Sequence, residues 1–322
     1  MNAILDLGIR WIVALQRVGT WPTLPMNLFS FLGTEDFFML ALPLLYWCVD
    51  SALGIRVALI LMLSTNLNDA LKMFFHAPRP YWYSPNVHGL ATETSFGLPS
   101  NHAQSAVVFW GLAAAYVRKW WAWLVAVLLM LLIGLSRLYL GVHFPHDVLF
   151  GWLIGGLLLL LALRFWDPVS AWAKKLSPAW QILAAFLASL VVFLLPVLPL
   201  AWLRGTGWQA PQAWASYATQ ALSLQDAATA AGTIFGLLAG LVWLSPQGGF
   251  QTRGVWWKLA LRVLLGGAGV LIIRYGLKFI FPEGESVLAY SLRYLRYALI
   301  GFWVAGGAPW AFIRANLSDK AS

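Results

Sequence analysis

Three short segments of this chain concentrate polar side chains that are unusual in so apolar a sequence. The segments read KMFFHAPRP, PSNHA and SRLYLGVHFPHD. Their chemically useful residues are Lys72, Arg79, Ser100, Asn101, His102, Arg137, His143 and Asp147. An ionisable group near lipid is costly unless something pairs with it, so each of these residues is a functional hypothesis by default.

A nucleophile and a general acid can be assigned from residue type and spacing. His143 and Asp147 lie four positions apart, at a turn where Pro145 can begin a helix. This spacing allows the carboxylate to hold the proton of one ring nitrogen, which leaves the other nitrogen free to attack phosphorus. His102 then becomes the candidate acid that protonates the leaving oxygen.

The remaining polar residues suit a phosphate group. Lys72 and Arg79 from one segment and Arg137 from another can surround it with three cations. Ser100 and the backbone N–H groups of the helix that follows can donate to its oxygens. Three fixed cations offset the charge of a five-coordinate phosphoryl transition state, so we expect no metal ion and no cofactor.

Composition predicts that membrane helices position these groups. Of the 322 residues, 61% are hydrophobic and 10% are charged, and the mean hydropathy is +0.73. Soluble domains carry roughly 25% charged residues. Continuous apolar runs such as WAWLVAVLLMLLIGL predict an all-α, polytopic membrane bundle rather than a β-barrel. The single cysteine, Cys48, excludes an internal disulfide and a cysteine-based metal site.

The apolar runs and the flanking charges predict how the chain crosses the bilayer. About nine spans of ordinary length are expected, near residues 35–50, 55–75, 102–117, 120–140, 146–165, 178–203, 227–244, 257–279 and 288–313. Lysines and arginines gather in the connections on one side, which the positive-inside rule makes cytoplasmic. The three polar segments then lie on the opposite, outer or luminal, face. The net charge of +9 is explained by topology and lipid headgroups, so no nucleic-acid partner is expected.

Other residues receive supporting roles. Asn68 and Asp69 precede Lys72 by four and three positions on one helix, and they are expected to hold its ammonium group. His146 is adjacent to Asp147 and cannot adopt the four-residue geometry, so it is assigned to the entrance or to packing. Two rows of small residues predict close helix packing. They are Gly151 with Gly155, and Gly232 with Gly236 and Gly240.

The three segments also carry a family resemblance. Residues 72–80 fit K-x6-R-P, residues 99–102 fit P-S-x-H, and residues 136–147 fit S-R-x5-H-x3-D. In this order they resemble the signatures of the type-2 phosphatidic acid phosphatase superfamily, which includes lipid phosphate phosphatases, undecaprenyl diphosphate phosphatases, glucose-6-phosphatase and vanadium haloperoxidases. FLGTEDFFMLALPLLYWCVD and NDALKMFFHAPRPYW are most similar to sphingosine-1-phosphate phosphatase-like members. The resemblance covers roughly residues 35–165, and the last third shows no signature.

The resemblance implies a role for each matched residue. His143 would form a phosphohistidine, Asp147 would orient it, and His102 would act as acid and then activate water. The phosphate ligands would be Lys72, Arg79, Ser100, Arg137 and the backbone amide of Asn101. Family members usually have glycine where Asn101 stands, so its side chain is expected to narrow the pocket.

The expected protein is a metal-independent phosphatase of a lipid monophosphate such as a long-chain base phosphate. Alternatives are an isoprenoid (undecaprenyl) diphosphate phosphatase, a lipid phosphotransferase, and a transporter or receptor on a phosphatase scaffold. The expected division is an interfacial segment at 1–34, a six-helix phosphatase core at 35–203 and additional helices at 204–322. We expect membrane lipids as partners and a bacterial inner membrane with the site facing the periplasm, or the lumen in a eukaryote. The oligomeric state stays open.

Overall fold

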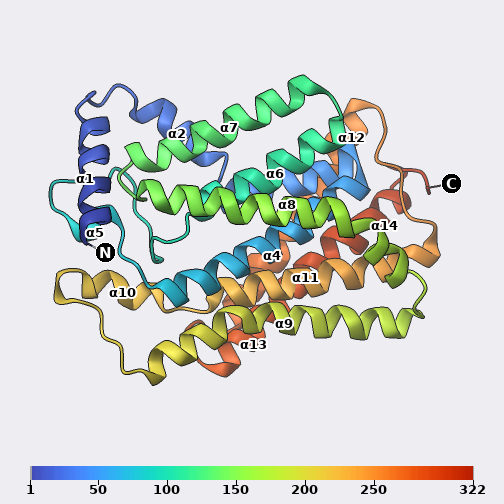
Figure 1. The fold of residues 1–322 in the computed structure, drawn as a ribbon. Helices are drawn as coiled ribbons and strands as arrows, with labels where there is room; N and C mark the ends of the chain where they lie inside the picture. Colours follow the sequence, from blue (N-terminus) through green and yellow to red (C-terminus); the bar gives the residue numbers. More distant parts are fainter. Residues whose placement is uncertain (1, 322) are drawn as a thin grey trace. The chain divides into compact units, whose positions relative to one another are not determined.

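The computed structural model describes residues 2–321, and within that range the chain forms helices and connecting loops without a strand (Figure 1). This confirms the all-α expectation. The chain divides into two compact units. Unit 1 comprises residues 1–38, 67–163 and 195–223, and unit 2 comprises residues 39–66, 164–194 and 224–322.

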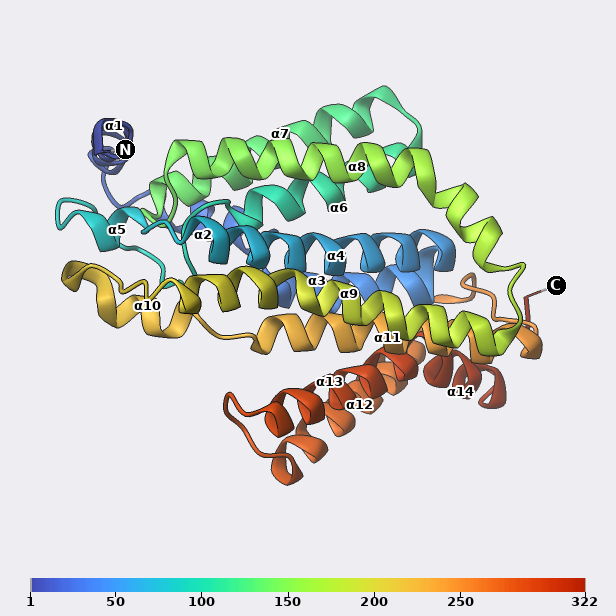
Figure 2. The same ribbon diagram turned by 60° about the horizontal axis from the view of Figure 1, so that its bottom comes forward.

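Unit 1 contains the three polar segments. Its own helices are α1 (Asn2–Gln16), α2 (Thr23–Phe31), α5 (Pro80–Tyr83), α6 (Asn101–Val117), α7 (Trp120–Tyr139), η2 (Gln212–Trp214) and α10 (Ala215–Ala221). Four helices contribute residues to both units: α3 (Glu35–Leu44), α4 (Ser51–Phe75), α8 (Pro145–Ala173) and α9 (Pro178–Gly205). Helices α6 and α7 lie side by side in both views (Figures 1 and 2). Within unit 1, α8 lies against α6.

Small residues allow α8 to approach α6 closely. A Cβ atom on Gly151 would lie 2.6 Å from the Ser100 carbonyl oxygen, and one on Gly155 would lie 2.6 Å from the Gln104 carbonyl oxygen. This confirms the packing role predicted for the pair. The first turn of α8 and the N-terminus of α6 are thereby held together, and both carry candidate site residues.

Unit 2 contains η1 (Leu45–Val49), α11 (Gln225–Leu244), η3 (Ser245–Gln247), α12 (Trp256–Ile280), α13 (Val287–Phe302), η4 (Trp303–Gly307) and α14 (Ala308–Arg314). Helix α11 packs along α13. A Cβ atom on Gly240 would lie 2.9 Å from the Phe302 carbonyl oxygen, and Gly232 and Gly236 approach the α13 backbone in the same way. The second glycine row is therefore also a helix-packing surface, as predicted.

The structure supports fewer membrane spans than the nine expected. Six helices of the described chain are long and apolar enough to cross a bilayer: the continuous α4–α5 segment, α7, α8, α9, α11 and α12. The bent pair formed by α2 and α3–η1 makes at most a seventh span. Helix α6 coincides with a predicted span but has only 17 residues, and at 1.5 Å per residue it is short for a hydrocarbon core of about 30 Å. Helix α13 has 16 residues and continues without a break through η4 and α14 to Arg314, a run that is not among these six helices. The chain is an integral membrane protein.

Candidate active site

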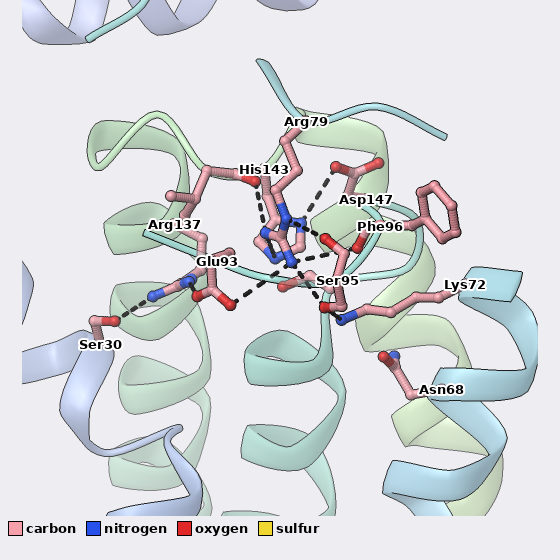
Figure 3. Close-up of polar contacts among 12 residues, drawn as sticks. Ser30, Asn68, Lys72, Arg79, Glu93, Ser95, Phe96, Arg137, His143 and Asp147 are labelled. Atoms are coloured by element: carbon pink, nitrogen blue, oxygen red, sulfur yellow. Dashed lines mark hydrogen bonds and ion pairs between the residues drawn. The ribbon is translucent and has the colours of Figure 1, made fainter. Parts of the chain in front are cut away.

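Residues from the first and third polar segments meet in one cluster (Figure 3). Nη1 of Arg79 lies 3.1 Å from Nε2 of His143, and Nδ1 of His143 lies 3.3 Å from Oδ2 of Asp147. All three side chains are almost completely buried. The fold thus brings the cation of Arg79 next to a histidine and its carboxylate partner, although Arg79 precedes them by more than 60 positions in the sequence.

Local backbone chemistry places these side chains at helix ends. Arg79 is the extended N-cap of α5, directly before Pro80. Helix α7 ends after Arg137, and Gly141 then adopts a φ of +75°, a conformation that favours glycine. The chain reverses there and α8 begins at Pro145, a residue suited to the first helical position. His143 consequently lies in a tight connection between two apolar helices.

The hydrogen bonds define the tautomer of His143. A guanidinium group has no acceptor, so Nε2 must accept from Arg79 and must carry the lone pair. Nδ1 then carries the proton and donates it to Asp147. The same carboxylate oxygen accepts from the backbone N–H of Phe144 at 2.9 Å, which fixes its position. This arrangement presents an unprotonated nitrogen toward the cations, as a nucleophile requires.

Arg79 is held rigidly by the loop before α6 and by the connection before α8. Its nitrogens donate to the carbonyl oxygens of Ser95 at 2.6 Å, Val142 at 2.9 Å and Phe96 at 3.3 Å. The side chain is fully buried. A planar fork fixed in this way is pre-organised to bind an oxyanion with little further loss of conformational entropy.

Two residues of the cluster, Glu93 and Ser95, were missed by the sequence analysis. The Glu93 carboxylate pairs with Arg137 and lies 3.6 Å from Nη2 of Arg79. Nζ of Lys72 donates to Oγ of Ser95 at 2.7 Å. The available signal was an acidic residue six positions before PSNHA, within reach of a group of predicted cations.

Charge and burial set the ionisation of the groups outside the spans. Burial acts to raise the pKa of Glu93, but Arg79 and Arg137 overcome this effect and hold the pKa well below its usual range. Burial, followed by the field of Arg79 and Arg137, lowers the pKa of His143 well below its ordinary value. Glu93 is therefore an anion, and His143 is neutral, at physiological pH.

The second polar segment forms the start of α6 beside this cluster. Ser100 is buried and caps the helix, because its side chain accepts from the Ala103 N–H, and its own N–H donates to the Asp147 carbonyl oxygen at 3.0 Å. Asn101 accepts from Ser105 at 3.2 Å. His102 lies in the first turn and is close to Gly33, where an added Cβ would come within 3.1 Å of its ring.

One expected contact is absent. The Asn68 amide nitrogen donates to Gln104 at 2.8 Å and to the Pro99 carbonyl oxygen at 3.3 Å, and the Asn68 amide oxygen has no hydrogen-bond partner in the described chain. Asn68 therefore does not hold Lys72, and the expectation was wrong for this residue. Its amide nitrogen tethers α4 to the start of α6 instead. For Asp69, the proposed support of Lys72 remains a prediction.

His146 has the packing role expected of it. Its ring stacks on Phe144 with centroids 5.2 Å apart, and its Nε2 lies 3.3 Å from Oδ1 of Asp147. His143, by contrast, contacts Oδ2 of Asp147 and faces Arg79.

Comparison with known families decides the class of the chain. Residues 53–170, which include all three polar segments, match the PAP2 superfamily. Residues 228–320 match the family described as PAP2 superfamily phosphatase, transmembrane extension. The chain contains a PAP2 superfamily domain and a PAP2 transmembrane extension. The resemblance drawn from the three motifs is thereby confirmed, and the last third, in which the sequence analysis found no signature, is an extension found in other PAP2 proteins.

Individual PAP2 relatives include phosphatases of lipids. The chain is 36% identical over 140 residues to a probable sphingosine-1-phosphate phosphatase of Dictyostelium discoideum, covering 39% of this chain and 34% of the relative. It is 31% identical over 131 residues to phosphatidylglycerophosphatase B of Bacillus subtilis (strain 168), and this match covers 38% of this chain and 62% of the relative. The chain thus spans less than two thirds of the length of these curated relatives.

A solved PAP2 structure is also similar. The crystal structure of the first transmembrane PAP2 type phosphatidylglycerolphosphate phosphatase from Bacillus subtilis shares 25% sequence identity and a TM-score of 0.47. The match covers 52% of this chain and 89% of the solved chain.

Proposed function

We propose that this PAP2 protein is a metal-independent phosphatase of membrane lipid monophosphates, acting through a phosphohistidine on His143. The observation that carries the proposal is the unprotonated Nε2 of His143, oriented by Asp147 through Nδ1 and facing Arg79. A neutral imidazole directed at a group of cations is suited to attack a bound anionic ester.

The proposed reaction has two steps. In the first, Nε2 of His143 forms a bond to phosphorus while the bond from phosphorus to the lipid oxygen breaks, and His102 gives its proton to that oxygen. In the second, His102 accepts a proton from water, whose oxygen attacks phosphorus and breaks the nitrogen–phosphorus bond. Inorganic phosphate and the free imidazole are the products.

The cations and the start of α6 stabilise the charge that develops on the phosphoryl oxygens. Lys72, Arg79 and Arg137 supply positive charge, while Ser100 and the Asn101 backbone amide supply donors at a helix N-terminus. Asp69 would support Lys72. These roles agree with those implied by the superfamily resemblance.

A lipid substrate is favoured by the setting and by the relatives. The cluster lies where apolar helices α7 and α8 meet, so a phosphate headgroup can reach it while its hydrocarbon tail remains in the bilayer. The relatives named above act, by their names, on sphingosine-1-phosphate and phosphatidylglycerophosphate. Both are lipid phosphate monoesters, so we place long-chain base phosphates and similar monophosphates ahead of isoprenoid diphosphates. We further propose that the site faces the outer side of a bacterial inner membrane.

The test is phosphate release by the full chain, purified in detergent, from a panel of lipid monophosphates and diphosphates in excess EDTA. Wild-type protein is expected to hydrolyse monophosphates, and His143→Gln is expected to be inactive. Undiminished hydrolysis by that variant, or hydrolysis that EDTA abolishes, would refute the mechanism.

A further inference from the structure

The loop segment Glu93–Ser95 fills the place where the phosphate group is expected to bind. Lys72 donates to Oγ of Ser95, and Nε of Arg79 donates to the Ser95 carbonyl oxygen. Arg137 and Arg79 both pair with the Glu93 carboxylate. All three cations therefore direct donors at oxygens of this one segment (Figure 3).

A second anion cannot occupy the same place. Two negative charges a few ångströms apart repel strongly in a site that excludes most water. The charge-assisted donors of Arg79 and Arg137 that face Glu93 are also the ones a phosphate would need. Binding of phosphate therefore requires the Glu93 carboxylate to leave.

We propose that Glu93 is an internal occupant of the phosphate site, which the phosphate group of the substrate must displace. This inference depends on the proposed function in one respect only: it takes a phosphate group as the ligand of the site. Glu93 is then a specificity-determining residue. Only a ligand that recovers more from the three cations than Glu93 does will open the site, and its apparent affinity is reduced by the cost of displacement.

The local contacts allow this exchange without unfolding the loop. The segment is anchored on both sides, because the Leu90 N–H donates to the Leu140 carbonyl oxygen and the Gly97 N–H donates to the Ala77 carbonyl oxygen. Between these anchors, the Glu93 side chain is 22% exposed to solvent. A rotation toward the exposed side releases both arginines while the anchors hold.

The experiment is calorimetric titration of the full chain in detergent with inorganic phosphate. Glu93→Gln keeps the size of the side chain and removes its charge, so phosphate should bind at least tenfold more tightly than to wild type. The control is Asp167→Asn, an exposed carboxylate that pairs with Arg56 in unit 2, and it should bind phosphate as wild type does. Unchanged or weaker binding by Glu93→Gln would overturn the proposal.

A second variant decides the matter if Glu93→Gln does not fold. Ser95→Ala removes the oxygen that accepts from Lys72 and Arg79, and phosphate should bind a few-fold more tightly. Unchanged affinity would then refute the internal-occupant role. Phosphate binding needs no turnover. If the wild-type chain hydrolyses no lipid phosphate but the variants still bind inorganic phosphate more tightly, the proposed function is disproved. The internal-occupant role of Glu93 is then still supported.

A different observation, in unit 2, carries a second inference. A small, partly open hollow lies at the turn between α12 and α13, lined by Gln225, Phe281, Pro282, Glu283, Arg293 and Arg296 among others. Arg296 is only 6% exposed, and its Nε has no hydrogen-bond partner in the described chain. Its guanidinium stacks over the ring of Tyr297 at 5.4 Å. This buried Nε–H is therefore a donor that an anion in the hollow would satisfy.

We infer that this hollow binds the phosphodiester headgroup of an anionic membrane phospholipid. Arg293 lines it as a second cation, held in place by Gln225 and Thr229. Nearby residues of α12 expose a large apolar surface on which an acyl chain can lie, with Ile272 71% and Phe279 91% exposed. The phosphodiester carries a single negative charge and suits two arginines, one of which is already hydrogen-bonded.

Native mass spectrometry of the detergent-purified chain can test this site. Wild type should retain one phosphatidylglycerol molecule more than Arg296→Gln and should prefer it to phosphatidylcholine, while Arg253→Gln, an exposed charge-matched control, should behave as wild type. Equal retention by wild type and Arg296→Gln, or no preference of wild type for the anionic lipid, would overturn the inference. Displacement of the lipid by millimolar inorganic phosphate would identify a free-anion site and also contradict it.

Discussion

Replacing Asp147 with asparagine separates the two tasks of this carboxylate. Oδ2 accepts from both the Phe144 N–H and Nδ1 of His143. In Asp147→Asn, the backbone N–H of Phe144 requires the amide oxygen, not the NH₂ group, to take the place of Oδ2. The new NH₂ group then points toward Nε2 of His146, which lies 3.3 Å from Oδ1 in the wild type and can accept from it. The His143 tautomer is therefore preserved and only the negative charge is lost.

The structure thus predicts a moderate loss of activity. A hydrogen bond to a charged group contributes about 1.5–3 kcal/mol and a neutral one about 0.5–1.5 kcal/mol, so loss of the charge alone costs about 1–1.5 kcal/mol. Since 1.36 kcal/mol corresponds to a factor of ten in rate, kcat/KM should fall by about 5- to 13-fold. Reversal of the tautomer would cost far more, on the order of 10⁴-fold, as in catalytic triads. Asp147→Ala should lose more than Asp147→Asn, because it leaves the Phe144 N–H and Nδ1 unpaired.

The assay is phosphate release from a lipid monophosphate in detergent micelles, with gel filtration and thermal unfolding of each variant to confirm the fold. Two results would refute the reasoning. If Asp147→Asn were as inactive as His143→Gln, the amide would not be oriented by Phe144. If its kcat/KM stayed within twofold of wild type, the charge of Asp147 would not assist His143.

Three further outcomes follow from the geometry. Gly151→Ala places a Cβ 2.6 Å from the Ser100 carbonyl oxygen, so thermal unfolding should show a loss of stability of about 1–3 kcal/mol. Gly156→Ala is the control, because its Cβ would have nothing within 4 Å, and it should be neutral or slightly stabilising. Equal effects of the two substitutions would contradict the packing of α8 on α6. His146→Gln should reduce kcat/KM only a few-fold, because its ring packs on Phe144; inactivity would reassign the nucleophile. The ¹³C-histidine NMR signal that His143→Gln removes should stay at its neutral position as the pH falls from 8 through about 6.5, the ordinary histidine pKa. The folded state then binds fewer protons than the unfolded chain, so the contribution of this group to stability is lost below that pH, and titration of the signal near pH 6.5 would disprove the lowered pKa.

The sequence predicted the local geometry of the candidate site better than the long-range contacts that assemble it. The four-residue interval between His143 and Asp147 and the turn at Pro145 are local features, so their geometry followed from spacing alone. The glycine rows were equally readable, because only close packing explains small residues at helical intervals. The helical class followed from composition.

Long-range contacts could not be predicted in the same way. Asn68 was expected to support Lys72 on its own helix, yet its amide bonds to residues that follow it by 31 and 36 positions. Glu93 was not singled out from the sequence, because only the fold places it between Arg79 and Arg137. The sequence predicted about nine spans, whereas six helices of the described chain, or seven with the bent pair, are long and apolar enough to cross a bilayer.

The most direct test of the central claim is to trap the covalent intermediate. Wild-type protein mixed with a ³²P-labelled lipid monophosphate and quenched in alkaline detergent, which preserves phosphohistidine, should carry label on the peptide that contains His143. His143→Gln should carry none. Label on His102, or rapid phosphate release by wild type with no labelled protein at any time point, would contradict the assignment of His143 as the nucleophile.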